Sequence, residues 1–127
     1  MTLTPRTLAP GIRVVDAPQR FAGLEVGARL TLLETDGGML AHSPVPIAPE
    51  DVGGARWVLA PNLLHHLYVG PWIDHGAEAW AAPGLTEKRD DLAFAGTIDD
   101  ASHPFGDAIR LLPLSCFPFS NEVVVLH

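Results

Sequence analysis

The sequence predicts an α/β domain of the layered α+β kind, with a mixed β-sheet, an N-terminal β-hairpin and short helices. Three observations lead to this prediction. Apolar and β-branched runs dominate residues 11–41, an apolar strand at 57–59 leads directly into a predicted helix, and strands then alternate with short helices. Twelve glycines and twelve prolines are spread along the 127 residues, which favours many short elements joined by tight turns in one domain, residues 1–127.

The first third of the chain is expected to form strands. Residues 11–15 are rich in β-branched side chains, residues 21–26 form a weaker candidate, and residues 28–34 alternate apolar and polar side chains. Asp36-Gly37-Gly38 separates the last of these runs from the apolar residues 39–41. Because glycine supplies the positive φ of a tight turn, this pattern predicts a β-hairpin over residues 30–41.

Residues 43–55 are expected to lie outside the sheet, and the chain is expected to rejoin the sheet at residues 57–59. Three prolines within residues 43–49 exclude a helix or a central strand, so this stretch is predicted to run extended over the surface. One helical turn can follow within residues 50–55, and residues 57–59 are predicted to be a buried strand. Asn62 is the predicted N-cap of a helix that continues to residue 68 and ends at Gly70-Pro71.

The remaining elements are predicted to be short. A helix is expected over residues 72–77, a strand over 79–81 and a turn at 83–85. The charges of residues 86–91 are mixed in sign and indicate an exposed face. Residues 108–112 and 122–127 are the last two predicted strands.

Composition limits the possible partners. Eight Lys and Arg against fifteen Asp and Glu give a net charge of −7, which argues against binding of nucleic acid or of an anionic membrane surface. No segment reaches the roughly 20 apolar residues that span a bilayer, and the N-terminus lacks a signal-peptide core. Cys116 is the only cysteine, so no intrachain disulfide forms. We therefore expect a cytoplasmic protein.

Several short motifs occur in an order that resembles one known family. They are the hairpin over 30–41, His42-Ser43-Pro44-Val45-Pro46, Ala60-Pro61-Asn62, His65-His66-Leu67, Ala82-Pro83-Gly84-Leu85 and Asn121-Glu122-Val123-Val124. Over residues 10–127 the sequence resembles a bacterial domain family of unknown function that is built on the metallo-β-lactamase fold. The resemblance implies a sandwich of two βα halves, of which this chain would contain little more than the first.

The resemblance also implies a degenerate metal motif. Enzymes of that fold carry a His-x-His-x-Asp-His pattern after the strand that corresponds to 57–59. Here Asn62 and Leu64 stand at the first two histidine positions, and His65 and His66 remain. His65 and His66 are therefore candidate metal ligands, with Asn62 orienting them and His127 as a more distant candidate. The alternative from the residues themselves is that Asn62 caps a helix while one histidine bonds locally and the other meets solvent.

Family members continue beyond the Asn-Glu-Val-Val strand to an aspartate that bridges the metals, and this sequence ends at His127 before it. The chain is thus expected to be a truncated half sandwich, either a fragment of a longer chain or one half of a homodimer. An uncovered sheet face would leave a large apolar surface, which soluble monomers rarely show.

The sequence gives little indication of a serine nucleophile or a reactive cysteine. His42 could reach the same sheet edge as His65. Ser43 and Ser115 lack the Gly-x-Ser-x-Gly pattern of a nucleophile elbow. Cys116 lies among apolar residues and is expected to pack in the core.

Two functions remain. The first is a domain of unknown function that acts in ligand binding or assembly. The second is a metal-dependent hydrolase, with zinc or iron, whose site is completed by further residues or by a second chain.

Overall fold

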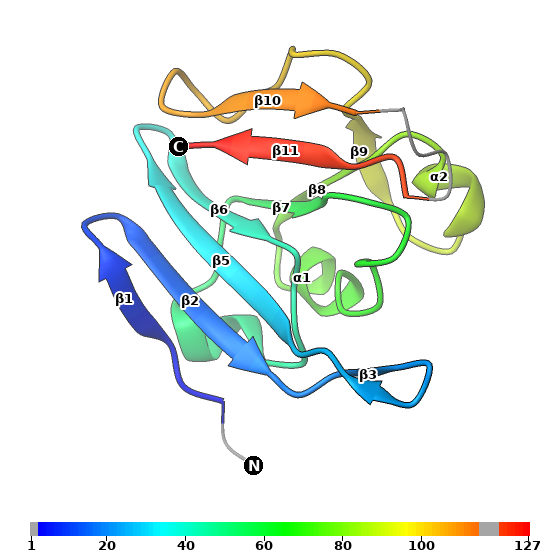
Figure 1. The fold of residues 1–127 in the computed structure, drawn as a ribbon. Helices are drawn as coiled ribbons and strands as arrows, with labels where there is room; N and C mark the ends of the chain where they lie inside the picture. Colours follow the sequence, from blue (N-terminus) through cyan, green and yellow to red (C-terminus); the bar gives the residue numbers. More distant parts are fainter. Residues whose placement is uncertain (1–2, 115–119) are drawn as a thin grey trace.

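A seven-stranded mixed sheet forms the centre of the molecule (Figure 1). The computed structural model describes residues 3–114 and 120–127. Pairing is antiparallel from β1 to β6 and parallel from β6 to β9. In spatial order the strands are β1 (Arg6–Ala9), β2 (Ile12–Ala17), β5 (Ala28–Thr35), β6 (Gly38–His42), β7 (Trp57–Ala60), β8 (Glu78–Ala81) and β9 (Phe94–Thr97).

The two faces of this sheet are covered differently. Short helical turns pack on one face: η1 (Pro49–Val52), α1 (Gly70–Asp74) and α2 (Leu85–Lys88). Each supplies a buried side chain to this core, namely Val52, Trp72 and Leu85. On the opposite face lies an antiparallel pair of strands, β10 (Arg110–Pro113) and β11 (Val123–Leu126) (Figure 1). The sheet is therefore the middle layer of a three-layer arrangement.

Strand alternation explains how each strand serves both cores. In β5 the fully buried Leu30 and Leu32 face the helical turns, whereas Leu33 faces the β10–β11 pair. β7 is buried along its whole length, as expected for a central strand with both faces covered. A small hairpin of β3 (Arg20–Phe21) and β4 (Leu24–Glu25) extends from the sheet between β2 and β5.

The predicted hairpin over residues 30–41 is confirmed as β5–β6, with Thr35 paired to Gly38 across the turn. The Thr35 hydroxyl donates to the carbonyl of Gly38 at 2.7 Å. The positive φ falls at Gly38, at 141°, and not at Gly37. A Cβ at Gly37 would lie 3.0 Å from the Trp57 ring, so a side chain there would require that ring to shift. The predicted strands at 57–59, 79–81, 108–112 and 122–127 correspond to β7, β8, β10 and β11.

Other expectations need correction. The weak strand over 21–26 is interrupted by a turn that separates β3 from β4. Residues 43–45 are buried, so the proline-rich run begins inside the protein and not on its surface. The helix expected over 72–77 is α1, which starts two residues earlier and contains Pro71 near its N-terminus, where the missing N–H costs nothing. β1 and β9 were not predicted.

Ser115 and Cys116 lie outside the described residues. Among the helices of residues 3–114 and 120–127, none has the length and hydropathy needed to cross a membrane.

Candidate functional site

The segment after β7 carries the residues that the sequence singles out, but it is not a helix. Residues 62–68 form bends and turns, and α1 begins only at Gly70. The carbonyl of Leu63 accepts a hydrogen bond from Lys88 Nζ at 2.6 Å, and the carbonyl of His66 accepts one from Arg89 Nη1 at 3.3 Å. In a helix these carbonyls would accept from amides four residues later. The predicted helix over 62–68 is therefore wrong.

Asn62 nevertheless makes the capping interaction that its position predicts. Its Oδ1 accepts hydrogen bonds from the backbone N–H groups of Leu64, at 2.9 Å, and His65, at 2.8 Å. Its Nδ2 donates to Glu122 Oε2 at 2.8 Å. These partners fix the orientation of the amide, because the oxygen must face the two N–H groups and the nitrogen must face the carboxylate. Asn62, only 5% exposed, thus ties the segment after β7 to the start of β11.

His65 contacts Ser43, the residue that follows β6. Ser43 Oγ lies 3.1 Å from His65 Nδ1, and Asn62 Nδ2 lies 3.5 Å from the same nitrogen. In the tautomer that carries the ring proton on Nε2, His65 Nδ1 accepts from both groups, because the amide nitrogen can only donate. The Ser43 hydroxyl is then the donor to His65. Ser43 is buried, and its φ of 60° lies in the left-handed region that few non-glycine residues adopt.

His42 lies next to this pair. It ends β6 and is half-buried. Burial, and after it the charge of a protonated His65 nearby, lower the pKa of His42 from 6.5 to about 4. His42 is therefore uncharged at neutral pH. The expectation that His42 and His65 reach the same sheet edge is confirmed.

These residues form part of the wall of an open groove of about 630 Å³. His42, Ser43, His65 and Glu122 contribute to one groove although they come from three separate stretches of sequence. A second hollow of about 380 Å³ shares Thr31, His42 and Glu122 with the first and extends along β11. The volume of each hollow is in the range of small-molecule sites, about 300–1,000 Å³.

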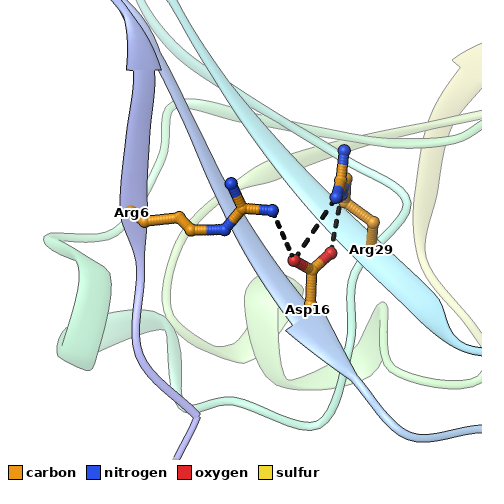
Figure 2. Close-up of polar contacts among 3 residues, drawn as sticks. All are labelled: Arg6, Asp16 and Arg29. Carbon is orange, nitrogen blue, oxygen red and sulfur yellow. Dashed lines mark hydrogen bonds and ion pairs between the residues drawn. The ribbon is translucent and has the colours of Figure 1, made fainter.

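A charged cluster borders the groove. Figure 2 shows the Asp16 carboxylate between two guanidinium groups, with Arg6 Nη2 at 2.9 Å and Arg29 Nε at 2.6 Å. Hydrogen bonds from Arg29 and then Arg6 lower the pKa of Asp16. The three side chains come from adjacent strands, β2, β1 and β5. Asp16 and Arg29 both line the groove, so it offers charged groups in addition to its neutral wall.

His66 is directed toward a different partner. Its Nδ1 lies 3.0 Å from Arg89 Nη1, which can only donate, so Nδ1 is an acceptor. Arg89 is itself held by two bonds of 2.9 Å to Asp91. Burial, then the charges of Lys88 and Arg89, lower the pKa of His66. Arg89 was expected on an exposed face, whereas its side chain is only 23% exposed.

His127 lies at the far end of β11 from Glu122. Its Nε2 is 3.0 Å from the carbonyl oxygen of Glu34, a contact in which the nitrogen donates. It lines the second hollow and not the groove that His65 lines. His65, His66 and His127 therefore have separate partners.

The donor set does not fit a metal centre. Within residues 3–114 and 120–127, no group of three or more His, Cys, Asp or Glu side chains is arranged to hold a metal ion. A structural zinc needs four ligands and a catalytic zinc three from the protein. The ring nitrogens closest to other side chains, Nδ1 of His65 and Nδ1 of His66, are already engaged as acceptors. The metal assignments of His65, His66 and His127 remain predictions.

Sequence reasoning did not single out Glu122, Arg89 or the pairing of Ser43 with His65. Glu122 accepts a hydrogen bond from Asn62, which is 60 positions away in the sequence, and no local sequence pattern predicts such a contact. Arg89 belongs to a mixed charge run that is typical of solvated surface. Ser43 did carry one signal, since it stands at the end of a predicted strand beside His42.

Comparisons with known proteins identify the fold. The metallo-β-lactamase FIM-1 from Pseudomonas aeruginosa, solved in its mono-zinc form, is similar over 99% of this chain and 65% of its own, with 11% identity and a TM-score of 0.70. DIM-1 metallo-β-lactamase exposed to ceftazidime matches 97% of this chain and 64% of its own, with 12% identity and a TM-score of 0.71. A metallo-β-lactamase from Hirschia baltica matches 98% and 66%, with 10% identity and a TM-score of 0.68.

The chain therefore has a metallo-β-lactamase-like fold of the α+β class, as predicted. It spans just under two thirds of the length of these three structures, 64% to 66%. Neither a protein-family model nor any curated protein matches the sequence. At 10% to 12% identity the likeness concerns the fold alone.

Proposed function

We propose that this metallo-β-lactamase-like domain is a binding module that takes a small polar ligand in the groove at the end of β6. The observation that carries the proposal is the hydrogen-bonded wall Ser43–His65–Asn62–Glu122, in which Ser43, His65 and Glu122 line a groove of about 630 Å³ and Asn62 holds them from behind. A wall whose side chains are already held by one another loses little conformational freedom when a ligand binds.

The chemistry of the wall indicates the kind of ligand. Asn62 and Ser43 are almost fully buried, so their positions are set by the fold. In the Nε2–H tautomer, His65 supplies a donor, and the Glu122 carboxylate supplies an acceptor. Arg29 adds a cation to the same groove. A small molecule with both donors and acceptors would match this lining.

The test is a binding screen against the purified protein. We expect members of a library of small polar organic fragments to shift the NMR resonances of His42, Ser43, His65 and Thr31. Thr31→Phe fills the groove and is expected to abolish these shifts, because Thr31 lines both hollows. Thr7→Phe, at an exposed position on β1, is the matched control. Fragment binding that persists in Thr31→Phe, or that maps elsewhere, would contradict the proposal.

The second candidate is a metal-dependent hydrolase completed by a second chain or by further residues. It is favoured by the likeness to metallo-β-lactamases, one of them solved in a mono-zinc form, and by the presence of two histidines in the groove. In this alternative His65 and His66, with His127, would be metal ligands and Asn62 would orient them. Because the donors do not gather in the described residues, we assign no reaction step to a metal.

Metal analysis separates the two candidates. Protein purified without chelators is expected to contain no stoichiometric zinc, iron or manganese if the binding module is correct, and its melting temperature should not change when chelator is added. Near-stoichiometric metal together with a chelator-induced fall in melting temperature would support the hydrolase.

A further inference from the structure

Ser43 has an unusual backbone for a serine. Its φ is 60°, although glycine is the residue that adopts this region without cost. One contact of the fold holds it there. The Ser43 amide donates to the carbonyl of Leu59 at 3.0 Å, which extends the β6–β7 pairing by one bond. Strained residues of this kind gather at functional sites, where the surrounding structure keeps them in place.

The hydrogen bond of Ser43 has the polarity that a nucleophile requires. Asn62 accepts two backbone N–H groups at its oxygen and donates to Glu122 from its nitrogen, so the amide cannot be turned round. That nitrogen lies 3.5 Å from His65 Nδ1 and donates to it in the tautomer that carries the ring proton on Nε2. In the same tautomer the Ser43 hydroxyl, 3.1 Å away, donates to the imidazole. This is the relation between a nucleophilic hydroxyl and its general base.

The base is positioned from outside the pair. Asn62 binds the backbone N–H of His65 and contacts its ring, while Glu122 binds Asn62. Glu122 and Asn62 are thus positioning residues that act through His65. Ser43 and His65 both line the groove, which gives a substrate access to the pair.

We propose that Ser43 is a nucleophile that accepts an acyl group from a small ester, with His65 as its general base. The proposal rests on the groove being the ligand site described above. In the first step the Ser43 Oγ–acyl carbon bond forms, the bond from that carbon to the alkoxide breaks, and the Ser43 proton passes through His65 Nδ1 to the departing alcohol. In the second step water attacks the acyl carbon and gives a proton to His65, the Ser43 Oγ–acyl carbon bond breaks, and His65 returns the proton to Ser43 Oγ as the carboxylic acid leaves. The sum is ester plus water to acid plus alcohol.

The probe is diisopropyl fluorophosphate, which phosphorylates an activated serine with loss of fluoride. Intact-mass analysis is expected to show one adduct, and peptide mapping is expected to place it on Ser43. Ser43→Ala should remove the adduct, whereas Ser102→Ala, in an exposed loop, should keep it. An adduct on another serine, or no adduct at all, would overturn the proposal.

The role of His65 is tested by rate. His65→Gln is expected to slow the labelling of Ser43 by about 100-fold, within the range that general-base catalysis contributes. His75→Gln, an exposed histidine remote from the groove lining, should label at the wild-type rate. Circular dichroism confirms that each variant is folded. An unchanged labelling rate in folded His65→Gln would contradict the assignment of the base.

A turnover assay completes the test. p-Nitrophenyl acetate is expected to give a burst of p-nitrophenol in the wild type and none in Ser43→Ala. The binding proposal and this one can fail separately. Fragments that shift groove resonances without any labelling of Ser43 would leave a binding module and remove the nucleophile. Labelling of Ser43 that is unaffected by Thr31→Phe would remove the groove as the route to it.

Discussion

Asn62 uses every hydrogen-bonding group of its side chain. One buried amide holds the turn after β7, the carboxylate that precedes β11 and the ring of His65. A capping residue is ordinarily a local device that satisfies the first amides of a helix. Here the Asn62 oxygen satisfies the amides of a turn, and the Asn62 nitrogen connects the central sheet to the layer formed by β10 and β11.

Asn62→Ala is expected to lower the free energy of unfolding by about 1–3 kcal/mol, because it leaves two backbone N–H groups and the Glu122 carboxylate without this partner. Glu122→Gln keeps an acceptor oxygen for Asn62 and should cost less. Urea unfolding of both variants measures the difference. A loss below about 0.5 kcal/mol in Asn62→Ala would show that Asn62 contributes little to holding the layers together.

His42 makes stability depend on pH in a defined direction. Its pKa is about 4 in the folded protein and 6.5 when unperturbed. Between these values the unfolded chain binds the proton and the folded chain does not, so the contribution of His42 is complete above pH 6.5 and is lost as the pH falls toward 4. From pH 7 to pH 5 the expected loss is about 2 kcal/mol.

The measurement is urea unfolding of the wild type and His42→Gln at both pH values. Stability of the wild type should fall more steeply with acidification than that of His42→Gln. His75→Gln, at an exposed position, is the matched control and should follow the wild type. Parallel curves for the wild type and His42→Gln would contradict the low pKa of His42.

At the level of elements, the sequence predicts those helices and strands whose conformation is determined by residues close to one another in the chain. The β5–β6 hairpin has its turn residues between two apolar runs, and the buried β7 is a continuous apolar stretch, so both were predictable. The segment after β7 was not, since carbonyls that a helix would use are taken by Lys88 and Arg89 from another part of the chain.

The two strands that were not predicted, β1 and β9, lack the local sequence pattern of a strand. β1 has an exposed pattern and pairs only with β2, so its residues need no apolar alternation. β9 contains Gly96, which weakens a strand pattern but is placed opposite Trp80 of β8. The same holds for the candidate site. The capping role of Asn62 was predictable from nearby residues, whereas its bond to Glu122 depends on how segments far apart in the sequence pack together.

Gly96 leads to a prediction about the edge of the sheet. A Cβ at this position would lie 2.6 Å from Trp80 Cζ3. The Trp80 ring is restrained by a bond of 2.8 Å to Glu78 and by an edge contact with Phe105. Gly96→Ala is therefore expected to destabilise the protein by about 1–3 kcal/mol, the usual cost of overpacking.

Urea unfolding followed by tryptophan fluorescence measures this change. Gly70→Ala is the matched control, because a Cβ there would meet Leu92 at an ordinary 3.6 Å. Equal stability of Gly96→Ala and Gly70→Ala would show that Trp80 moves aside without cost.

For the molecule as a whole, the central sheet and the β10–β11 pair differ in the kind of side chain that they leave exposed. The Arg6–Asp16–Arg29 cluster (Figure 2) lies on the sheet face that carries β10 and β11, because Asp16 alternates along β2 with Val15 and Ala17, which face the helical turns. Charged side chains make this part of the face compatible with water. The outer face of the β10–β11 pair is different, with Leu112 58%, Val124 41% and Leu126 64% exposed.

We propose that a homodimer, one of the two alternatives that the sequence leaves open, would use this outer face. Full burial of an exposed leucine or valine is favourable by about 1.5–3 kcal/mol, and these side chains are about half exposed, so each would contribute roughly half of that against a second copy. A lysine in the same place would oppose contact. Leu126→Lys is therefore expected to shift the protein from dimer to monomer in size-exclusion chromatography with light scattering, measured over a concentration series. Leu24→Lys, on β4 and 68% exposed, is the matched control and should leave the dimer intact. A wild type that stays monomeric at the highest concentration, or a dimer that survives Leu126→Lys but not Leu24→Lys, would place self-association elsewhere or exclude it.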